Sequence, residues 1–268
     1  NQIVVGHVEA GLRTRNKYSP YPEEINRQLT GVLADLHFSP TAKSAENLLQ
    51  ENKNADTIFI TGNTAIDALK TTVRKDYYHP ILKKIGNSRL ILVTAHRREN
   101  LGKPMENMFR AIRKIINEHE DVQVVYPVHL NPVVRESAYS ILGSHPRIHL
   151  IDPLDVIDFH NISARSYLIL TDSGGIQEEA PSLGVPVLVL RNTTERPEGI
   201  EAGTLKLAGV EENTIYSLTK ELLEDKDTYQ KMAKAANPYG DGFASKRIAD
   251  AILYYFKKSN QRPEEFII

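Results

Sequence analysis

Short apolar runs alternate with amphipathic stretches of helical periodicity along almost the whole chain. Several of these runs are continuous and rich in β-branched residues, which is typical of strands buried on both faces of a parallel sheet. We predict strands at Ile3–Val5, Leu36–Phe38, Ile58–Ile60, Leu90–Val93, Val122–Tyr126, Ile148–Leu150, Leu168–Leu170 and Val187–Leu190. We predict helices at Thr41–Gln50, Pro104–His119, Val133–Leu142, Thr214–Ala236 and Ala244–Lys257. The alternation predicts an α/β fold in which right-handed crossovers join parallel strands.

The predicted strands divide into two groups at a polar connector between Thr61 and Arg89. Too few strands precede this joint for a complete doubly wound domain, whereas a full set follows it. We therefore expect an incomplete N-terminal domain over residues 1–65 and a complete Rossmann-like domain over 66–242. A C-terminal helical segment, 243–268, is expected to pack back on the first domain. The chain also opens on Asn1 with a strand-like run, from which we expect that upstream sequence is missing.

Composition excludes several classes of function. The 268 residues are 41% hydrophobic and 25% charged, as in an ordinary globular protein, and the net charge of −1 favours neither nucleic acid nor an anionic membrane as a partner. The absence of cysteine excludes disulfides, thiolate nucleophiles and Cys-ligated metals, and suits a cytoplasmic protein. Motifs typical of zinc proteases, α/β-hydrolases and nicotinamide-binding enzymes are missing as well. We therefore expect neither a metal nor a cofactor.

The turn Ser173-Gly174-Gly175 joins an apolar strand to a short predicted helix. Such a turn lets backbone N–H groups reach an anion at the start of a helix, where the helix dipole also favours negative charge. One turn further on, Glu178 and Glu179 offer carboxylates that can accept hydrogen bonds from sugar hydroxyls. A diphosphate and a ribose together indicate a nucleotide. The same residues also fit an ordinary strand–turn–helix corner with no ligand.

Polar side chains follow four of the predicted strands directly, and open α/β sheets bind ligands beyond the carboxyl ends of their strands. The four segments are Gly6–Thr14, Thr94–Asn100, Pro127–Pro132 and Thr171–Gly175. Their repetition favours a functional site over chance. Structural alternatives remain for single residues: His7 as a buried imidazole, Glu23 paired with Arg27 on a helix surface, Arg97 in a solvated loop and Phe159 in the core.

Five segments occur together in an order that resembles the bacterial non-hydrolysing UDP-N-acetylglucosamine 2-epimerase family. They are His7–Thr14, Pro22–Arg27, Thr94–Asn100, Tyr126–Pro132 and Thr171–Glu179, and the match continues through Thr194–Glu198 and Asn237–Gly242. The resemblance implies two Rossmann-like domains of glycosyltransferase-B type, with the active site between them. It also implies that roughly the first hundred residues of the N-terminal domain are absent, a large share of a domain of ordinary size. A further catalytic Asp and a basic nucleotide contact belong to that segment, and the chain alone is expected to be inactive.

The resemblance implies interconversion of UDP-N-acetylglucosamine and UDP-N-acetylmannosamine for surface polysaccharide or cell-wall synthesis. UDP is eliminated to give 2-acetamidoglucal and is then added back, which requires an acid and a base on opposite faces of C2. Glu9 and Glu23 match the carboxylates of the family, and the resemblance does not decide which of them acts on which face. His96 matches a position near the diphosphate or the glycosidic oxygen.

The same resemblance assigns the nucleotide contacts. Ser173, Gly174 and Gly175 donate to the diphosphate, and Glu179 rather than Glu178 binds the ribose. The remaining assignments are Phe159 beside the uracil, Arg196 near the phosphates or sugar, and Arg97 with His129 at a second, activating UDP-N-acetylglucosamine. A cytoplasmic homodimer without cofactor is implied.

Three alternatives remain open. A UDP-sugar glycosyltransferase has the same fold, although it needs no acid–base pair at C2, so Glu9 and Glu23 favour the epimerase. A hydrolysing relative would release free N-acetylmannosamine and UDP. The chain as given could also be a non-catalytic UDP-binding fragment.

Overall fold

The computed structural model describes residues 2–268, so Asn1, where the first expected domain begins, lies outside them. The described chain forms two compact units, and each contains one parallel sheet, which confirms the α/β class. The first unit holds the described residues up to Lys70 together with Thr194–Glu198 and Asn237–Ile268, and the second holds Thr71–Thr193 and Gly199–Ala236. Thr194–Glu198, which the sequence placed in the second domain, therefore packs with the first unit.

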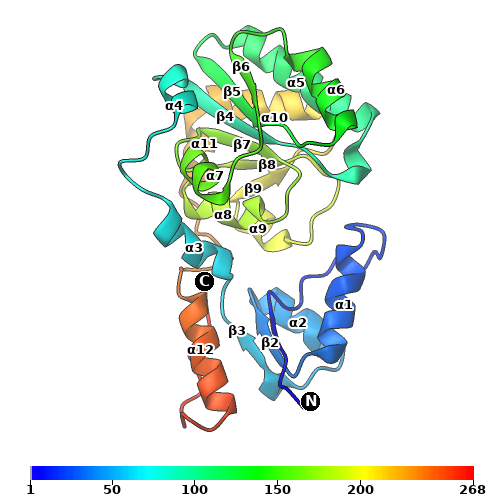
Figure 1. Ribbon diagram of the computed structural model, residues 1–268, viewed down its shortest axis with the longest axis vertical. Coiled ribbons are helices and arrows are strands. Elements are labelled where there is room, and N and C mark those ends of the chain that lie inside the picture. The colour runs from blue at the N-terminus through cyan, green and yellow to red at the C-terminus, as the bar shows by residue number, and fades with distance from the viewer. Residues whose placement is uncertain (1) are drawn as a thin grey trace. The chain divides into compact units, whose positions relative to one another are not determined.

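The second unit is built on a six-stranded parallel sheet. Its strands are β4 (Arg89–Thr94), β5 (Val122–Pro127), β6 (Ile148–Ile151), β7 (Leu168–Thr171), β8 (Val187–Val189) and β9 (Leu205–Leu207). They lie in the order β6-β5-β4-β7-β8-β9 (Figure 1). This is the strand order of a doubly wound Rossmann domain, and its switch point lies between β4 and β7. The sheet therefore predicts where a ligand binds before any side chain is considered.

Helices cover both faces of this sheet because successive strand side chains point to opposite faces. Ile91 and Val93 pack with one apolar cluster, whereas Leu90 and Leu92 pack with the other. The first cluster includes residues of α5 (Lys103–Glu118), α6 (Pro132–Leu142), α10 (Glu212–Glu224) and α11 (Lys226–Ala233). The second includes residues of α4 (Pro80–Ile85), α7 (Val156–Ser163) and α8 (Ile176–Ser182).

Two features of the second unit differ from the sequence-based prediction. The single helix expected at Thr214–Ala236 is divided into α10 and α11 by Asp225. The Asp225 side chain accepts hydrogen bonds from the amides of Asp227 and Thr228, so it caps a new helix rather than continuing the old one. Strand β9 was not predicted, because Lys206 interrupts its short apolar run, Leu-Lys-Leu.

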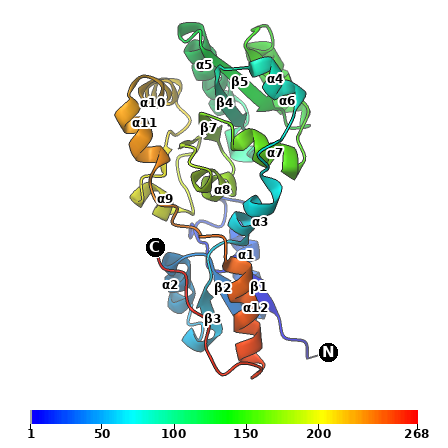
Figure 2. The ribbon, with the colours of Figure 1, turned by 90° about the vertical axis from the view of Figure 1, so that its left-hand side faces the viewer.

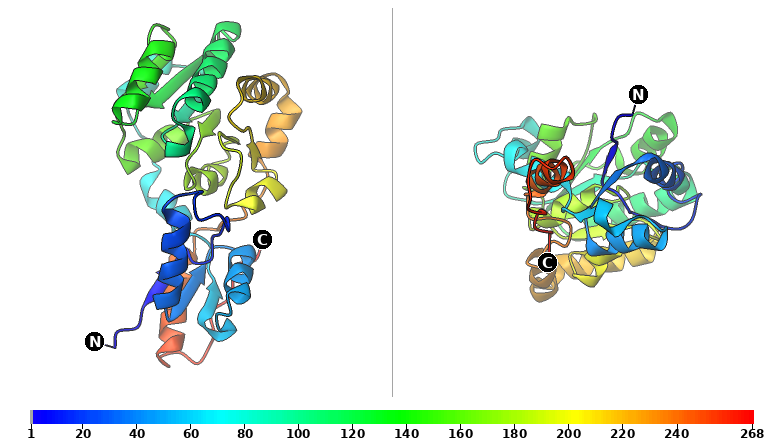
Figure 3. Two further views of the ribbon diagram at one scale, coloured as in Figure 1. Left: turned by 90° about the vertical axis from the view of Figure 1, so that its right-hand side faces the viewer. Right: turned by 90° about the horizontal axis from the view of Figure 1, so that it is seen from below.

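The first unit contains a three-stranded parallel sheet. Its strands β1 (Gly6–Val8), β2 (Leu36–Ser39) and β3 (Ile58–Ile60) lie in that order. Helix α2 (Ala42–Gln50) lies on one face of this sheet and α12 (Ala244–Tyr255) on the other (Figures 2 and 3). Leu48 of α2 packs with Ile58, and Ala251 of α12 packs with Phe38 and Phe59. The other helices near this unit are α1 (Glu23–Leu33), α3 (Thr64–Thr72) and α9 (Pro197–Glu201).

The prediction of a strand at Ile3–Val5 is wrong, because the first strand begins at Gly6. Ile3 and Val5 are exposed, and the ladder starts only where Gly6 lies opposite Leu36. An apolar run has the composition of a strand, but a strand begins only where its backbone forms a ladder of hydrogen bonds with a neighbouring strand. His7 therefore lies within β1 rather than after it, and burial together with Arg13 and Arg27 lowers its pKa.

None of the helices described between residues 2 and 268 has the length and apolar character that a membrane span requires.

Gly11 lies in the loop after β1, where the backbone passes close to α2. Its φ is +90°, and a Cβ at this position would lie 2.0 Å from the carbonyl oxygen of Ser44. We expect Gly11→Ala to destabilise the protein by about 3–5 kcal/mol, the sum of a left-handed backbone and an overpacked contact. Gly203→Ala is the matched control, because Gly203 has φ +77° and open space at Cβ. It is expected to cost about 1–2 kcal/mol. Equal costs in urea unfolding would contradict the packing argument.

Candidate functional site

The loops that leave β4 and β7 are joined by one buried carboxylate, that of Asp172. The strand ends themselves meet through the hydroxyls of Thr94 and Thr171, whose oxygens are 2.6 Å apart. Asp172 is fully buried, and its Oδ2 accepts hydrogen bonds from the amides of His96 at 2.9 Å and Arg97 at 2.8 Å. The side chain of Asn100 donates to the same oxygen at 3.1 Å. Asp172 therefore holds the loop that carries His96 at the switch point.

The imidazole of His96 lies between this carboxylate and a second histidine. Its Nδ1 is 3.4 Å from Oδ1 of Asp172, and its ring stacks on His129 with centroids 5.7 Å apart. Burial lowers the pKa of His96, with the Asp172 carboxylate opposing the shift. The ring is therefore mainly neutral at pH 7 and can both donate and accept a hydrogen bond.

The turn from Ser173 to Gly175 follows β7 and leads into α8. The amide of Ser173 donates to the hydroxyl of Thr171 at 2.9 Å, so this backbone donor is already used within the chain. Gly175 has an ordinary right-handed conformation, with φ −61° and ψ −40°. Glycine is therefore not required there by the backbone. A Cβ would lie 3.6 Å from Oε1 of Glu179, so the missing side chain leaves room beside that carboxylate.

A cavity of about 450 Å³ lies at this edge of the sheet. Among the residues that line it are six of those singled out from the sequence: His96, His129, Phe159, Ser173, Gly175 and Glu179. They come from the loops after β4, β5 and β7 and from α7 and α8. Phe159 also packs against the core cluster, so its side chain belongs both to the core and to the cavity wall. Gly174 and Arg97 are not among the lining residues, although each is next in sequence to one that is.

Three of the residues singled out from the sequence, Glu9, Glu23 and Arg196, belong to the first unit. Arg196 is nearly fully buried, and its Nη2 lies 3.2 Å from Oε1 of Glu9. Its Nη1 lies 2.5 Å from Oε1 of the buried Glu195, which Arg27 approaches at 3.8 Å. The two arginines and two glutamates form one alternating network of charges.

Glu9 has a left-handed backbone, with φ +63°. This conformation is uncommon outside glycine and is concentrated at functional sites. The side chain is 42% exposed, and Asn63 donates to its Oε1 at 3.4 Å. The loop therefore holds a partly exposed carboxylate in a fixed place beside the Arg196 guanidinium.

Glu23 and Glu24 begin α1 with different environments. Glu24 is fully buried and accepts hydrogen bonds from the amides of Thr14 and Arg15 at 2.9 and 3.0 Å, so it holds the loop that follows Glu9. Glu23 is half-buried and makes neither of these contacts. The structure thus gives Glu24 a structural role that Glu23 does not share, a distinction that the sequence alone could not make.

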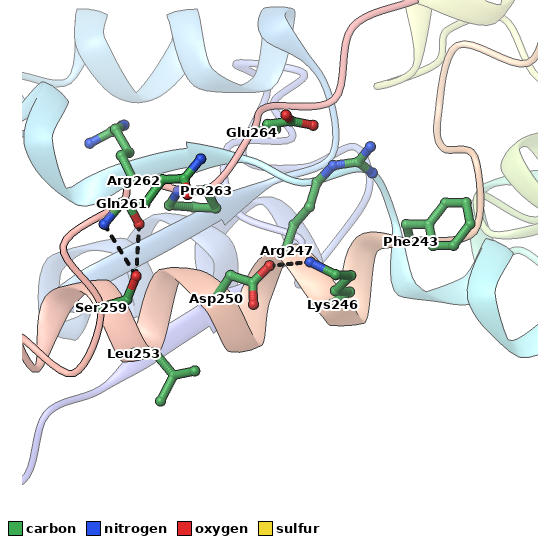
Figure 4. A pocket seen from close by; sticks show the side chains of 10 residues that line it. All are labelled: Phe243, Lys246, Arg247, Asp250, Leu253, Ser259, Gln261, Arg262, Pro263 and Glu264. Atoms are coloured by element: carbon green, nitrogen blue, oxygen red, sulfur yellow. Dashed lines mark hydrogen bonds and ion pairs between the residues drawn. The ribbon is translucent and has the colours of Figure 1, made fainter.

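A larger cavity, of about 540 Å³, lies in the first unit between α12 and the residues that follow it (Figure 4). It contains none of the residues singled out from the sequence. Its charged side chains bond within their own unit: Lys246 with Asp250 at 2.6 Å, and Arg247 with Asp241 at 2.8 Å. The smaller cavity at the switch point is therefore the candidate site. Within residues 2–268, no group of three or more acidic or histidine side chains is arranged to hold a metal ion.

Comparison with known proteins assigns the chain to a family. The family model described as UDP-N-acetylglucosamine 2-epimerase matches residues 1–253. The chain belongs to this family. It is 67% identical over 266 residues to the UDP-N-acetylglucosamine 2-epimerase of Bacillus subtilis, an alignment that covers 99% of this chain and 70% of the relative.

Solved structures of the epimerase family agree in fold. The S. aureus MnaA structure with UDP is 59% identical, has a TM-score of 0.97, and is matched over 100% of this chain and 73% of its own. The Neisseria meningitidis UDP-GlcNAc 2-epimerase bound to UDP-GlcNAc is 48% identical with a TM-score of 0.88, over 94% of this chain and 70% of its own. The α/β fold with two parallel sheets is thus that of the epimerase family.

Two residues of the epimerase chain that organise the cavity were not singled out from the sequence. Asp172 stands inside a quoted motif, directly after a strand, and that position was the available signal. His160 lies within α7 beside Phe159, and its neighbour Glu179 comes from another helix, so sequence offered no signal for it.

Proposed function

We propose that the protein interconverts UDP-N-acetylglucosamine and UDP-N-acetylmannosamine by eliminating UDP and adding it back. The observation that carries this proposal is the single cavity at the switch point, which gathers Phe159, Ser173, Gly175 and Glu179. An aromatic ring suits a base, a hydroxyl and an open backbone suit a diphosphate, and a carboxylate suits a ribose. The identity of the sugar and the type of reaction are inferred from the family to which the chain belongs.

In this proposal, the second unit binds UDP. The Ser173 hydroxyl and the amides of Gly174 and Gly175 donate to the diphosphate, since the Ser173 amide is already bonded to Thr171. Phe159 contacts the uracil, and Glu179 accepts hydrogen bonds from the ribose. His96, neutral and fixed by Asp172, donates to the diphosphate or the glycosidic oxygen.

The carboxylates of the first unit act on the sugar. One of Glu9 and Glu23 removes the C2 proton as the C1–O bond to UDP breaks, and the electron pair of the C2–H bond forms the C1=C2 double bond of 2-acetamidoglucal. The other carboxylate, protonated, then delivers a proton to the opposite face of C2 while a UDP oxygen bonds to C1 again. Arg196 stabilises the negative charge of the departing UDP. General acid–base catalysis of this kind contributes about 10²–10⁴-fold to a rate.

Exchange at C2 tests the proposal directly. Incubation of the enzyme with UDP-N-acetylglucosamine in deuterated water is expected to place one deuterium at C2 of both epimers, with no sugar acceptor present. Mass spectrometry and proton NMR measure the label. A UDP-sugar glycosyltransferase would give no label without an acceptor, and a hydrolysing relative would accumulate free UDP and free sugar. A UDP-binding fragment would bind UDP without any label appearing.

We extend the proposal to regulation through Arg97 and His129, which match positions linked to an activating UDP-N-acetylglucosamine. His129 stacks on His96, so an effector beside it contacts the catalytic loop directly. We expect added UDP-N-acetylglucosamine to accelerate the reverse reaction from UDP-N-acetylmannosamine before it inhibits as product. Simple product inhibition at every concentration would count against an activating site. The homodimer and the cytoplasmic location stay predictions.

A further inference from the structure

His160 connects two side chains that the proposed mechanism leaves unrelated. It follows Phe159 on α7 and is buried, with 5% of the residue exposed. Its Nε2 lies 3.5 Å from Oε2 of Glu179, and its Nδ1 lies 2.8 Å from the hydroxyl oxygen of Thr72. Each ring nitrogen therefore faces a polar group, one on either side of the ring.

These contacts select one tautomer. A carboxylate only accepts hydrogen bonds, so the Nε2 that faces Glu179 carries the proton. Nδ1 then accepts from the hydroxyl of Thr72, which can turn its hydrogen toward the ring. The Thr72 hydroxyl therefore donates to Nδ1 of His160, and the N–H at Nε2 faces the Glu179 carboxylate, which only accepts. The partner of one ring nitrogen fixes the tautomer of an imidazole and so sets what the other nitrogen can do. Here Thr72 fixes the His160 ring, and the ring in turn orients the Glu179 carboxylate.

Asn161, the residue after His160, holds the backbone around Thr72 in place. Asn161 is fully buried; its amide nitrogen donates to the carbonyl of Thr72 at 2.7 Å, and its amide oxygen accepts from the backbone N–H of Arg74 at 2.9 Å. The backbone around Thr72 is thus bonded to α7 independently of the imidazole. Thr72 ends α3 and is the second residue of the second unit. Its hydroxyl is consequently a fixed reference point for the His160 ring.

Glu179 needs such support, because it lies on the cavity wall with 21% of its side chain exposed. A glutamate there has several rotamers, and holding it in one of them lowers the cost of ligand binding. The room left beside it by Gly175 would otherwise permit the carboxylate to swing away.

We propose that His160 is a positioning residue that holds the Glu179 carboxylate toward the ribose hydroxyls, with Thr72 as its anchor. This inference rests on the proposed binding of UDP in the cavity and on Glu179 as the ribose ligand. This series of contacts from Thr72 through His160 to Glu179, the relay, makes the site selective for ribose over 2′,3′-dideoxyribose, because the fixed carboxylate is satisfied only by a sugar that offers it a hydroxyl.

The test compares UDP with 2′,3′-dideoxy-UDP, which lacks both hydroxyls, by isothermal titration calorimetry. The unmodified protein is expected to prefer UDP by about 10-fold or more, as for a hydrogen bond to a charged group. His160→Phe keeps a buried ring but removes both nitrogens. It is expected to lose most of this preference by weakening UDP about 5–10-fold while leaving the dideoxy compound unchanged. His160→Gln, whose amide can still donate to Glu179, is expected to restore part of the preference.

Thr72 offers a second pair of variants that do not disturb the cavity wall. Thr72→Val removes the hydroxyl at nearly constant volume, and Thr72→Ser keeps it. We expect Thr72→Val to reduce the preference for UDP and Thr72→Ser to leave it unchanged. This pair decides the question if His160→Phe fails to fold.

The possible outcomes distinguish a failure of the Glu179–ribose contact from a failure of the positioning role of His160. If Glu179→Gln removes the ribose preference and the His160 and Thr72 variants do not, the positioning role is wrong while the ribose contact stands. If a His160 variant weakens both nucleotides equally, the histidine is only structural and the inference fails. If the unmodified protein shows no preference, the ribose assignment of Glu179 fails, and the relay with it.

Discussion

Replacement of Glu9 by glutamine is expected to lower the rate of deuterium incorporation at C2 by about 10²–10⁴-fold, the usual contribution of one acid–base group. Glutamine keeps the size of the side chain and can still accept from Asn63 and Arg196, which lie 3.4 and 3.2 Å from the carboxylate oxygen. It cannot take or deliver a proton. The substitution therefore removes the chemistry while leaving the left-handed loop and its neighbours in place.

Measuring the UDP affinity of Glu9→Gln shows whether its slower deuterium incorporation comes from lost chemistry or from a damaged fold. Glu9→Gln is expected to bind UDP at least as tightly as the unmodified enzyme, since the nucleotide contacts proposed for the second unit do not involve Glu9 and Arg196 loses only a competing negative charge. Glu46→Gln is the matched control, because Glu46 is exposed and pairs with Lys43 on the surface of α2. Its exchange rate is expected to be unchanged. An exchange rate for Glu9→Gln within threefold of the control, roughly 0.65 kcal/mol, would remove Glu9 from the catalytic assignment.

Strand positions in the second unit could be predicted because burial on both faces leaves a clear mark in the sequence. Runs such as Leu168–Leu170 have no polar member and lie in the sheet as predicted. The same signal failed at Ile3–Val5, where Val5 accepts a hydrogen bond from Leu36 but the ladder begins only at Gly6. It also failed at Leu205–Leu207, where a lysine interrupts the apolar run. Apolar patterning reports burial, and only pairing decides where a strand begins.

The composition of the cavity could be predicted in part for the same kind of reason. The carboxyl ends of parallel strands meet at one edge, so His96, His129 and Ser173 were expected to lie together, and they line one cavity. Arg196 belongs to the first unit, where it lies against Glu9 and Glu195, and its role near the phosphates or sugar stays a prediction. No sequence pattern reveals that a short segment leaves one unit and packs in the other.

Asp172→Asn is expected to destabilise the second unit by about 1–3 kcal/mol, because a neutral amide oxygen makes weaker hydrogen bonds than the carboxylate oxygen that it replaces. The native carboxylate accepts three hydrogen bonds on one oxygen, from the amides of His96 and Arg97 and the side chain of Asn100. Asparagine can direct only its single amide oxygen at these donors, and its NH₂ group must then face the imidazole of His96, which lies 3.4 Å from the other oxygen. If the amide turns the other way, the NH₂ group meets three donors.

The same substitution at Asp121 supplies the control, because its carboxylate is 60% exposed and pairs with Arg89 at the surface. Asp121→Asn is expected to cost less than about 1 kcal/mol. Urea unfolding measures both costs, and hydrogen exchange at the amides of His96 and Arg97 is expected to speed up only in Asp172→Asn. Equal costs for the two variants would show that Asp172 does not hold the loop. Faster exchange at these two amides, with UDP affinity reduced in parallel, would instead mean that the buried carboxylate sets the geometry in which His96 meets the nucleotide.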